Sequence, residues 1–509
     1  MATSKRTSRR FDHLLVWPLC LVTLAGLVYL YFQNISIGTI APFSLGEEGA
    51  ALFAADYLSS GKNPYDLAFL TEHPWRVVGN PPFYYWLASW FFKVTGPVLL
   101  PLRLISTFAF VILLMVTYRI FALSGASKVA RVIGLITLSA FWSIWAFASR
   151  GTPDMLSLMF VALTIEQYMV LARKPKDDNI FRFPRLVVIA TLAVLATLTK
   201  QTGAAVVPAI AFALIVGRQW RLSLVFMGLY SVLISGVLLF VNNLTHGGLA
   251  AHLAFAMSSP LSLTTLRGHL TWLGSDWLLI AASPVCAVNL IVGYFERREE
   301  REGPYRHYLS ALVVMTVLFW VSAFASLIIL GTLASSVTDV YPVFFAVAWL
   351  VAMAVDYLER RYIPVLFIAF GAGLYVMHSL YQTEALQVTS MLRAEELIAA
   401  TSFDKKLMLS EECSLPMQLD ATPEFVDINT LMSGWSKHPE VLESHLTEIK
   451  NRIRNKEYGS IVINSLDGVL HKPYKYWDDS VIMLIKKNYR PQVEVAVDGR
   501  IQDFYLPRK

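Results

Sequence analysis

Two adjacent acids, Glu47 and Glu48, follow the first apolar segment of the chain, where a membrane helix would leave the bilayer. Ionisable groups at the membrane are costly to place and are usually functional. The same two acids can also cap a helix that begins near Ala50, because the positive end of a helix dipole favours negative charge. Residue type alone leaves both readings open. The first reading makes this pair the best candidate for a reactive centre.

Further charged and hydroxyl groups stand at other predicted membrane exits. Asp154 opens an apolar segment after Pro153, a pair that also suits the first turn of a helix. Lys200 is the only cation between two apolar half-spans, where it either snorkels to the surface or binds an anion such as a lipid phosphate. Arg267 and Tyr341 could serve the same anion, since arginine grips phosphate with a fork of donors and tyrosine donates a hydroxyl. Taken singly, each of these residues also has a structural explanation.

The composition indicates which elements must position these groups. Of 509 residues, 55% are hydrophobic and 16% are charged, against about 25% charged residues in a soluble protein. A helix needs about 20 apolar residues to cross about 30 Å of hydrocarbon. Apolar runs that reach or approach this length occupy residues 14–32, 99–123, 222–241, 309–330 and 363–377. The chain is therefore predicted to be an α-helical polytopic membrane protein.

The basic residues predict how the chain is oriented. Lys and Arg mark the cytoplasmic side of membrane proteins, and the N-terminal segment is basic. Basic clusters recur near residues 128–131, 173–185, 218–221, 297–306 and 360–361, with few basic residues in the loops between them. This alternation predicts about eleven transmembrane helices and a cytoplasmic N-terminus. An odd number of spans places the C-terminal end outside.

Residues 186–216 form an apolar stretch that is too long for one crossing. A single helix would extend roughly 46 Å at 1.5 Å per residue, which exceeds the bilayer. It would also leave one of its two basic flanks on the outer side. We therefore expect a break at residues 200–203, with the turn that contains Lys200 on the outer side. The two halves are short, and full crossing by both stays open.

Two regions lie outside the membrane in this topology. Residues 33–97 form a large first outer loop, in which 50–58 predicts an amphipathic interfacial helix and the aromatic-rich stretch 83–92 suits the headgroup region. After about residue 383 the sequence becomes polar and charged. We expect a membrane part over residues 1–383 and a compact outer α/β domain over 384–509. Its predicted strands are 407–409, 461–463, 493–497 and 501–506, and its predicted helices are 439–456 and 479–487.

Three histidines, His246, His252 and His269, fall in one outer loop. Their spacing matches no ligand pattern of a zinc site, and no cysteine is near. We expect ordinary loop histidines. The three cysteines of the chain lie far apart and predict no disulfide framework.

Several short motifs together resemble the GT-C class of membrane glycosyltransferases. An acidic pair follows the first span, and a Gly-x-x-Pro-Tyr turn, a Pro-Pro-aromatic return, an Arg-Leu-x-Ser helix start and a Lys-Gln turn come after it. In this chain the motifs are Glu47-Glu48-Gly49, Gly61-Lys62-Asn63-Pro64-Tyr65, Pro81-Pro82-Phe83-Tyr84-Tyr85, Arg103-Leu104-Ile105-Ser106 and Leu198-Thr199-Lys200-Gln201-Thr202-Gly203. The pattern resembles undecaprenyl-phosphate aminoarabinose transferases, lipid A galacturonosyltransferases and protein O-mannosyltransferases. The resemblance covers roughly residues 11–380.

The resemblance implies an inverting transfer of a sugar from a polyprenyl-phosphate donor. The acceptor would be a hydroxyl or phosphate of a lipid, glycan or protein on the outer face of the membrane. Glu47 would be the catalytic base, in place of the more usual aspartate. The acceptor or sugar would contact Glu48, Asp154 and Asn80, and the donor phosphate would contact Lys200, Arg267, Tyr341 and Arg76. The resemblance implies neither a metal nor a cofactor. It also implies a multi-pass protein of the bacterial inner membrane that acts on the cell envelope.

The chain departs from the aminoarabinose transferases at one motif, and two alternative functions remain open. The aminoarabinose transferases carry Glu-Lys-Pro where this chain has Gly79-Asn80-Pro81, so one phosphate-binding cation is missing and Arg76 is its nearest replacement. A polytopic lipid or glycan transporter or flippase would have a similar number of spans, but it should show charges or breaks inside them and related halves. A lipid A or O-antigen ligase-like enzyme is a nearer rival. The C-terminal domain is expected to bind the acceptor or the donor headgroup.

Overall fold

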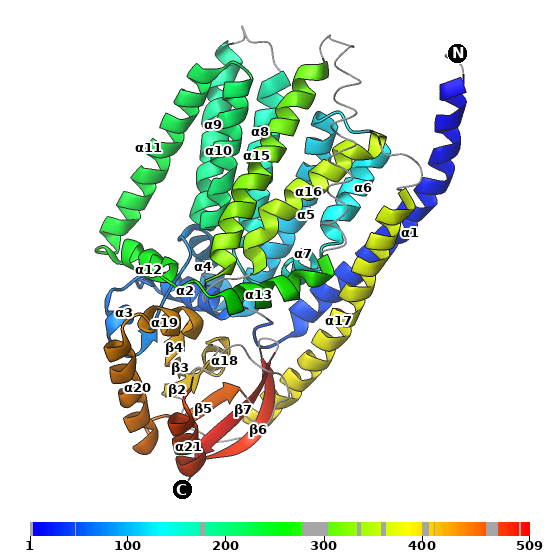
Figure 1. Ribbon diagram of the computed structural model, residues 1–509. Coiled ribbons are helices and arrows are strands. Elements are labelled where there is room, and N and C mark those ends of the chain that lie inside the picture. The colour runs from blue at the N-terminus through cyan, green and yellow to red at the C-terminus, as the bar shows by residue number, and fades with distance from the viewer. Residues whose placement is uncertain are drawn as a thin grey trace.

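The computed structural model describes residues 4–45, 47–173, 179–276, 304–332, 337–357, 363–399, 407–411, 413–464, 477–497 and 500–508. Long helices stand side by side and form a bundle, and a smaller domain of strands and short helices lies at one end of it (Figure 1). A layer of short helices lies between the two. The predicted basic clusters at 297–306 and 360–361 fall mostly outside the described residues.

The bundle contains helices long and apolar enough to cross a membrane. In the part of the chain that the structure describes, seven qualify by length and composition. They lie within α1 (Ser4–Ile40), α5 (Leu99–Leu123), α8 (Asp154–Arg173), α9 (Asn179–Thr199), α11 (Trp220–Leu244), α15 (Pro304–Leu330) and α17 (Ile363–Ala399). The prediction of an α-helical polytopic membrane protein is confirmed, and the count of about eleven spans stays a prediction. Shorter apolar helices in the bundle are α6 (Lys128–Ser139), α10 (Val206–Val216) and α16 (Tyr341–Ala354).

The predicted break in residues 186–216 is present. α9 ends at Thr199, the 3-10 turn η1 spans Gln201–Ala205, and α10 begins at Val206. Gly203 permits the turn to pack tightly, because a Cβ there would lie 2.5 Å from the carbonyl oxygen of Ala196. Lys200 therefore stands where one helix ends and another begins.

The short helices between bundle and domain come from the first outer loop and from later loops. They are α2 (Gly49–Ser59), α3 (Ala68–Thr71), α4 (Phe83–Thr95), α7 (Trp142–Phe147), α12 (Gly248–Met257), α13 (Leu263–Trp272) and η2 (Leu273–Asp276). The predicted helix over 50–58 is α2. Trp86 and Trp90 project from α4 with about half of their surface exposed, at 50% and 57%. Figure 1 shows α12 and α13 crossing beneath the long helices.

The C-terminal domain contains a five-stranded sheet of order β3-β2-β5-β7-β6. β2 (Leu407–Ser410) pairs in parallel with β3 (Thr422–Pro423) and β5 (Ser460–Asn464), and β7 (Arg500–Pro507) pairs antiparallel with β5 and β6 (Tyr489–Val497). The helices α20 (Pro439–Arg454) and α21 (Asp479–Asn488) accompany it. All four predicted strands and both predicted helices are present. The sequence did not predict β3, β4 (Phe425–Val426), α18 (Ser414–Gln418) or α19 (Ile428–Trp435).

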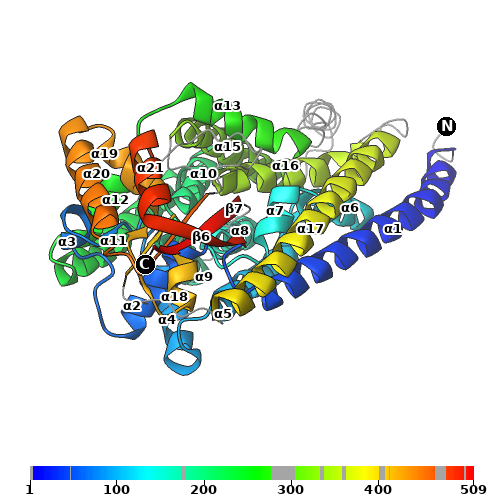
Figure 2. The ribbon, with the colours of Figure 1, turned by 90° about the horizontal axis from the view of Figure 1, so that it is seen from below.

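Two connections join the domain to the rest of the chain. β1 (Trp75–Arg76), in the first outer loop, pairs in parallel with β4 of the domain, and the Trp75 ring stacks on Phe425. α17 continues unbroken past residue 383, and its far end packs against β6 (Figures 1 and 2). Val388 and Met391 of α17 share a buried apolar cluster with Phe504. The change of composition near 383 thus falls inside a helix that reaches the sheet.

Candidate active site

A cavity of about 400 Å³ lies between the bundle and the C-terminal domain. Its volume falls in the usual range of ligand sites, roughly 300–1,000 Å³. Four of the predicted site residues line it together: Glu47, Asn80, Asp154 and Lys200. They come from the loop before α2, the segment after β1, the start of α8 and the turn after α9. Motifs that are as much as 153 positions apart in the sequence therefore meet at one site.

Glu47 presents its side chain to the cavity and is exposed. Its backbone adopts φ 58°, which is left-handed and unusual for a residue with a side chain. Such a conformation costs on the order of 1–3 kcal/mol and persists only where the surroundings impose it. Glu47 lies in the segment between the end of α1 and the start of α2.

Glu48 turns away from the cavity and is fully buried. Its two carboxylate oxygens accept hydrogen bonds from Arg103 Nε at 2.8 Å and from an Arg103 terminal nitrogen at 2.7 Å. The backbone N–H groups of Leu45 and Gly151 also donate to it, at 2.9 and 2.6 Å. Burial alone would raise the pKa of this carboxyl, but Arg103 and the two backbone donors outweigh it and hold the pKa below its usual value. Glu48 is therefore fully engaged and does not line the cavity, and its contact with the acceptor stays a prediction.

Arg103 uses all five of its N–H donors in this region. Besides the two bonds to Glu48, it donates to the backbone carbonyls of Gly38, Ala41 and Phe43 at 2.7, 2.7 and 2.8 Å. These carbonyls lie at and just after the end of α1, where a helix leaves acceptors without intrahelical partners. The Arg-Leu-x-Ser motif at the start of α5 thus holds the loop that carries Glu47.

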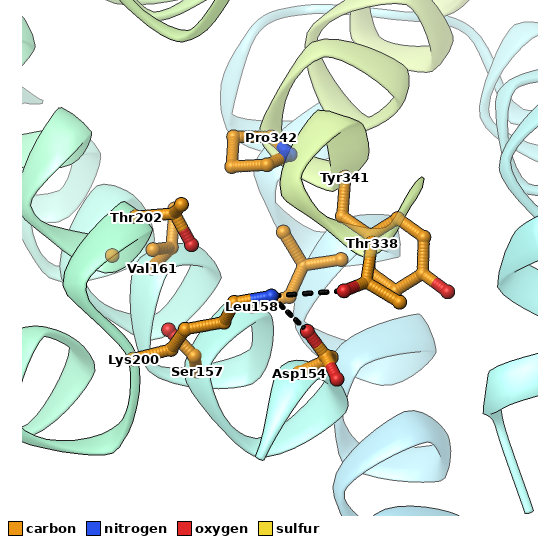
Figure 3. A pocket seen from close by; sticks show the side chains of 10 residues that line it. Asp154, Ser157, Leu158, Val161, Lys200, Thr202, Thr338, Tyr341 and Pro342 are labelled. Carbon is orange, nitrogen blue, oxygen red and sulfur yellow. Dashed lines mark hydrogen bonds and ion pairs between the residues drawn. The ribbon is translucent and has the colours of Figure 1, made fainter. Parts of the chain in front are cut away.

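Lys200 lies in a buried ionic cluster. Its Nζ is 2.5 Å from Asp154 Oδ1 and 2.9 Å from Asp339 Oδ1, and it donates to Thr338 Oγ1 at 2.8 Å. Figure 3 shows the bonds to Asp154 and Thr338. Burial lowers the pKa of Lys200, but the charges of Asp154 and Asp339 outweigh it and hold the pKa above its usual value. The sequence predicted Lys200 and Asp154, whereas Asp339 lay unrecognised in the small polar loop before Tyr341.

Tyr341 stands beside this cluster, at the start of α16. Its ring lines a smaller cavity that shares Asp154, Lys200 and Thr202 with the large one (Figure 3). Its hydroxyl donates to the carbonyl of Ser143 at 2.8 Å. The ring therefore supports the wall next to Lys200, and the hydroxyl is directed elsewhere.

The two arginines predicted to bind phosphate lie outside the cavity. The Arg76 guanidinium is buried 4.9, 5.2 and 4.9 Å from the ring centres of Phe53, Tyr57 and Phe69. It also donates to the Tyr57 hydroxyl. Arg267 is on an exposed face of α13. Cation–π contacts explain the position of Arg76, and phosphate binding by either arginine stays a prediction.

The segment around Asn80 is held by three other motifs. The hydroxyl of Tyr65, from the Gly-x-x-Pro-Tyr turn, donates to the Asn80 carbonyl at 2.8 Å. Gln201, next to Lys200, donates to the Gly79 carbonyl at 2.7 Å. His252 of α12 accepts from the N–H of Val78 at Nδ1 (3.1 Å), and its Nε2 contacts the Asp66 carbonyl at 2.9 Å. The buried His252 ring, as a neutral tautomer, thus holds the loop in place. Burial lowers the pKa of His252.

The C-terminal domain supplies a wall of the cavity that the sequence did not predict. Lining side chains include Glu411, which follows β2, and Asp427 and Thr430, which follow β4. Asp427 adopts φ 58° and caps α19, with its carboxylate accepting from the Thr430 N–H at 3.1 Å and the Thr430 hydroxyl at 2.7 Å. Burial raises the pKa of Asp427. An Asp directly before an apolar helix was the available signal.

The helices α12 and α15 supply an apolar wall. Ala256 and Met257, at the end of α12, and Ile328 and Ile329 of α15 line the cavity. Met257 has 75% of its surface exposed. The cavity therefore has an apolar side formed by membrane-associated helices, together with polar groups from the loops and the C-terminal domain.

Comparisons with known proteins identify the fold. The sequence model of the family described as Dolichyl-phosphate-mannose-protein mannosyltransferase matches residues 79–246. ArnT from Cupriavidus metallidurans bound to undecaprenyl phosphate is similar in structure, with 15% identity, a TM-score of 0.60, and 95% of this chain and 97% of that chain covered. Its apo state gives 14% identity and a TM-score of 0.56 over the same shares. An oligosaccharyltransferase from Archaeoglobus fulgidus gives 10% identity and a TM-score of 0.48, covering 96% of this chain and 74% of that one. No curated protein sequence matches the chain.

The chain has the fold of the GT-C membrane glycosyltransferases, as its motifs predicted. The family match spans Asn80, Asp154 and Lys200 and indicates a glycosyltransferase. Glu47 and the C-terminal wall lie outside the matched residues.

Proposed function

We propose that this protein is an inverting glycosyltransferase that moves a sugar from a polyprenyl-phosphate donor to an acceptor on the outer face of the membrane. The observation that carries the proposal is that Glu47 and the Lys200 cluster line one cavity beside membrane-associated helices. An exposed carboxylate and a buried cation are the two charges that such a transfer needs. The similarity of the fold to an ArnT bound to undecaprenyl phosphate supports the choice of donor.

Glu47 is the general base in this mechanism. It takes the proton of the acceptor O–H as the acceptor oxygen bonds to the anomeric carbon of the sugar. The bond from that carbon to the phosphate oxygen breaks in the same step, and the polyprenyl phosphate leaves with the electron pair. Glu48 and Arg103 act as positioning residues, because their ion pair holds the loop that presents Glu47.

Lys200 stabilises the charge that develops on the departing phosphate. An ammonium group has three donors, and here they reach Asp154, Asp339 and Thr338. The donor phosphate therefore has to displace one of these partners. The apolar wall of Met257, Ile328 and Ile329 is suited to the first isoprene units of the donor.

The orientation follows from the same proposal. The basic N-terminal segment lies in the cytoplasm, as the positive-inside rule predicts, and the cavity with the domain over residues 384–509 lies outside. The protein is then a multi-pass component of the bacterial inner membrane. An acceptor in the cell envelope can reach this side directly.

The test is transfer of label by the full-length protein in lipid nanodiscs. Wild-type protein, Glu47→Gln and the exposed loop variant Glu72→Gln receive a radiolabelled pool of polyprenyl-phosphate sugars and a bacterial envelope extract. We expect transfer by the wild type and by Glu72→Gln, and a loss of about 10²–10⁴-fold in Glu47→Gln, the usual contribution of a general base. Undiminished transfer by Glu47→Gln would remove this residue from catalysis. Absence of transfer by the folded wild type from every lipid-linked sugar would overturn the proposed reaction and favour a transporter.

A further inference from the structure

The charges around the large cavity are strongly unequal. Among the described residues that line it, five carry a carboxyl group and one carries an ammonium group. The carboxyl groups belong to Glu47, Asp154, Asp339, Glu411 and Asp427, and the ammonium group to Lys200. The ammonium is already paired with Asp154 and Asp339. The remaining three carboxyl groups come from the loop before α2 and from the C-terminal domain.

Nearby arginines are engaged with other partners. Arg103 directs all five donors to Glu48 and three backbone carbonyls. Arg76 is enclosed by aromatic rings. Arg150 is 2.5 Å from Glu384 of α17. Within the described part of the chain, the Lys200 cluster is therefore available to one phosphate. Among the described residues, the cavity lining contains no further cation for a second phosphate.

We infer that the acceptor presents neutral hydroxyl groups to the cavity rather than a phosphate, and that the domain wall formed by Asp427 and Thr430 binds those hydroxyls beside Glu47. This inference rests on the proposed glycosyl transfer and specifies its acceptor class. Carboxylates accept hydrogen bonds from sugar or polyol hydroxyls, whereas they repel a phosphate. The base Glu47 fits the same class, because a hydroxyl must lose its proton when it attacks and an ionised phosphate has none to lose.

The fold keeps Asp427 in place for this role. β4 ends one residue before it, and β4 is paired with β1, the strand that leads to Gly79 and Asn80 of the same cavity. The Thr430 N–H and hydroxyl occupy two of the acceptor positions on the Asp427 carboxylate. A carboxylate has about four such positions, so Asp427 retains capacity for a ligand hydroxyl.

The linkage in the product tests the inference directly. Full-length protein in nanodiscs receives radiolabelled polyprenyl-phosphate sugars and a bacterial envelope extract, and unused donor is removed by chromatography. The labelled product is then treated with mild acid, which cleaves glycosyl phosphates and leaves glycosides intact. We expect the label to stay attached, as it does after transfer to a hydroxyl. Release of the label as free sugar would show transfer to a phosphate and would overturn the inference while leaving the glycosyltransferase intact.

A matched pair of variants tests the wall. Asp427→Asn and Asp420→Asn change the same residue type in the same domain, and both positions have nearly equal left-handed backbones, at φ 58° and 57°. Asp420 is exposed and is not part of the cavity lining. We expect Asp427→Asn to raise the half-saturating amount of envelope extract about tenfold, the loss of one hydrogen bond to a charged group, with an unchanged half-saturating amount of donor. Asp420→Asn should match the wild type.

Two results would contradict the role of the wall. One is an unchanged extract dependence in Asp427→Asn, and the other is a change in donor dependence instead. Absence of transfer by the wild type would refute the proposed function and this inference together. This outcome is distinguishable from the two results above, because both of them require an active wild type.

Discussion

The carboxylate of Glu48 and the guanidinium of Arg103 form a buried two-point ion pair, 55 residues apart in the sequence. The pair joins the end of α1, the start of α5 and the backbone at Gly151. The next residue on one side of Glu48 is Glu47, which faces the cavity with a left-handed backbone. One acid of the adjacent pair is thus structural, and it sets the position of the acid that lines the cavity.

Adjacent glutamates should therefore respond in opposite ways to the same substitution. Glu48→Gln leaves the Arg103 charge buried without its counter-ion, which destabilises a protein by about 3–5 kcal/mol. Glu47→Gln changes an exposed side chain and should alter stability by less than about 0.5 kcal/mol, while it lowers transfer about 10²–10⁴-fold. Thermal unfolding in nanodiscs and the transfer assay measure the two effects on the same samples. Equal unfolding temperatures for the two variants would contradict the structural role of Glu48.

The Lys200 cluster predicts that loss of one of its acidic side chains strengthens the binding of polyprenyl phosphate. Asp339→Asn removes one of the two negative charges that compete with a phosphate for the ammonium group. We expect polyprenyl phosphate to bind about tenfold more tightly, a change of about 1.4 kcal/mol. Binding is measured as the concentration dependence of stabilisation by added polyprenyl phosphate. Asp420→Asn is the matched control and should leave binding unchanged. Unchanged binding to Asp339→Asn would place the phosphate away from Lys200.

His252 predicts how stability depends on pH. Burial lowers its pKa in the folded protein below the usual value of 6.5. Below pH 6.5 this histidine binds a proton in the unfolded chain but not in the folded chain. Its contribution to the free energy of unfolding is therefore fully present above pH 6.5, and it falls as the pH decreases toward the pKa of the folded protein. His252→Asn, which keeps an acceptor for the Val78 N–H, should lose this part of the pH dependence.

Thermal unfolding between about pH 7.5 and 5.5, across the ordinary histidine pKa, measures the effect. His246→Asn, at an exposed position with φ 51°, is measured alongside His252→Asn as the same substitution elsewhere in the chain. A slope that persists in His252→Asn would assign the pH dependence to another group.

The sequence predicted those parts of the site that are encoded locally. Glu47, Asp154 and Lys200 stand at helix ends, and the break at Lys200 followed from the length of the apolar stretch and from its two basic flanks. Four strands of the C-terminal domain followed from their β-branched and apolar runs. In each case the deciding information lies within a few residues, where periodicity and charge act directly.

The remaining parts depend on contacts between distant residues. Residue type does not reveal that Glu48 meets Arg103, or that Arg76 is enclosed by Phe53, Tyr57 and Phe69. The sequence did indicate part of this aromatic enclosure, because Phe53 and Tyr57 are four residues apart and share one helix face. The wall of Asp427 and Thr430 depends on the pairing of β4 with a two-residue strand in a loop 350 positions earlier. Strands of that length carry almost no pattern.

Gly151 offers a test of how tightly the Glu48 ion pair is built. A Cβ at this position would lie 2.5 Å from the Cβ of Leu102 and 3.2 Å from Glu48 Oε1. Gly151→Ala should therefore separate the turn before α8 from α5 and weaken the Gly151 N–H bond to Glu48, which costs about 1–3 kcal/mol by overpacking. Gly228→Ala, in α11, meets nothing within 4 Å and should stabilise by a few tenths to about 1 kcal/mol, because alanine favours a helix more than glycine does. Unfolding temperatures of the two variants measure the difference, and transfer should fall only in Gly151→Ala, since displacement of Glu48 also displaces Glu47. A stable and fully active Gly151→Ala would show that the loop carrying the base does not depend on this contact.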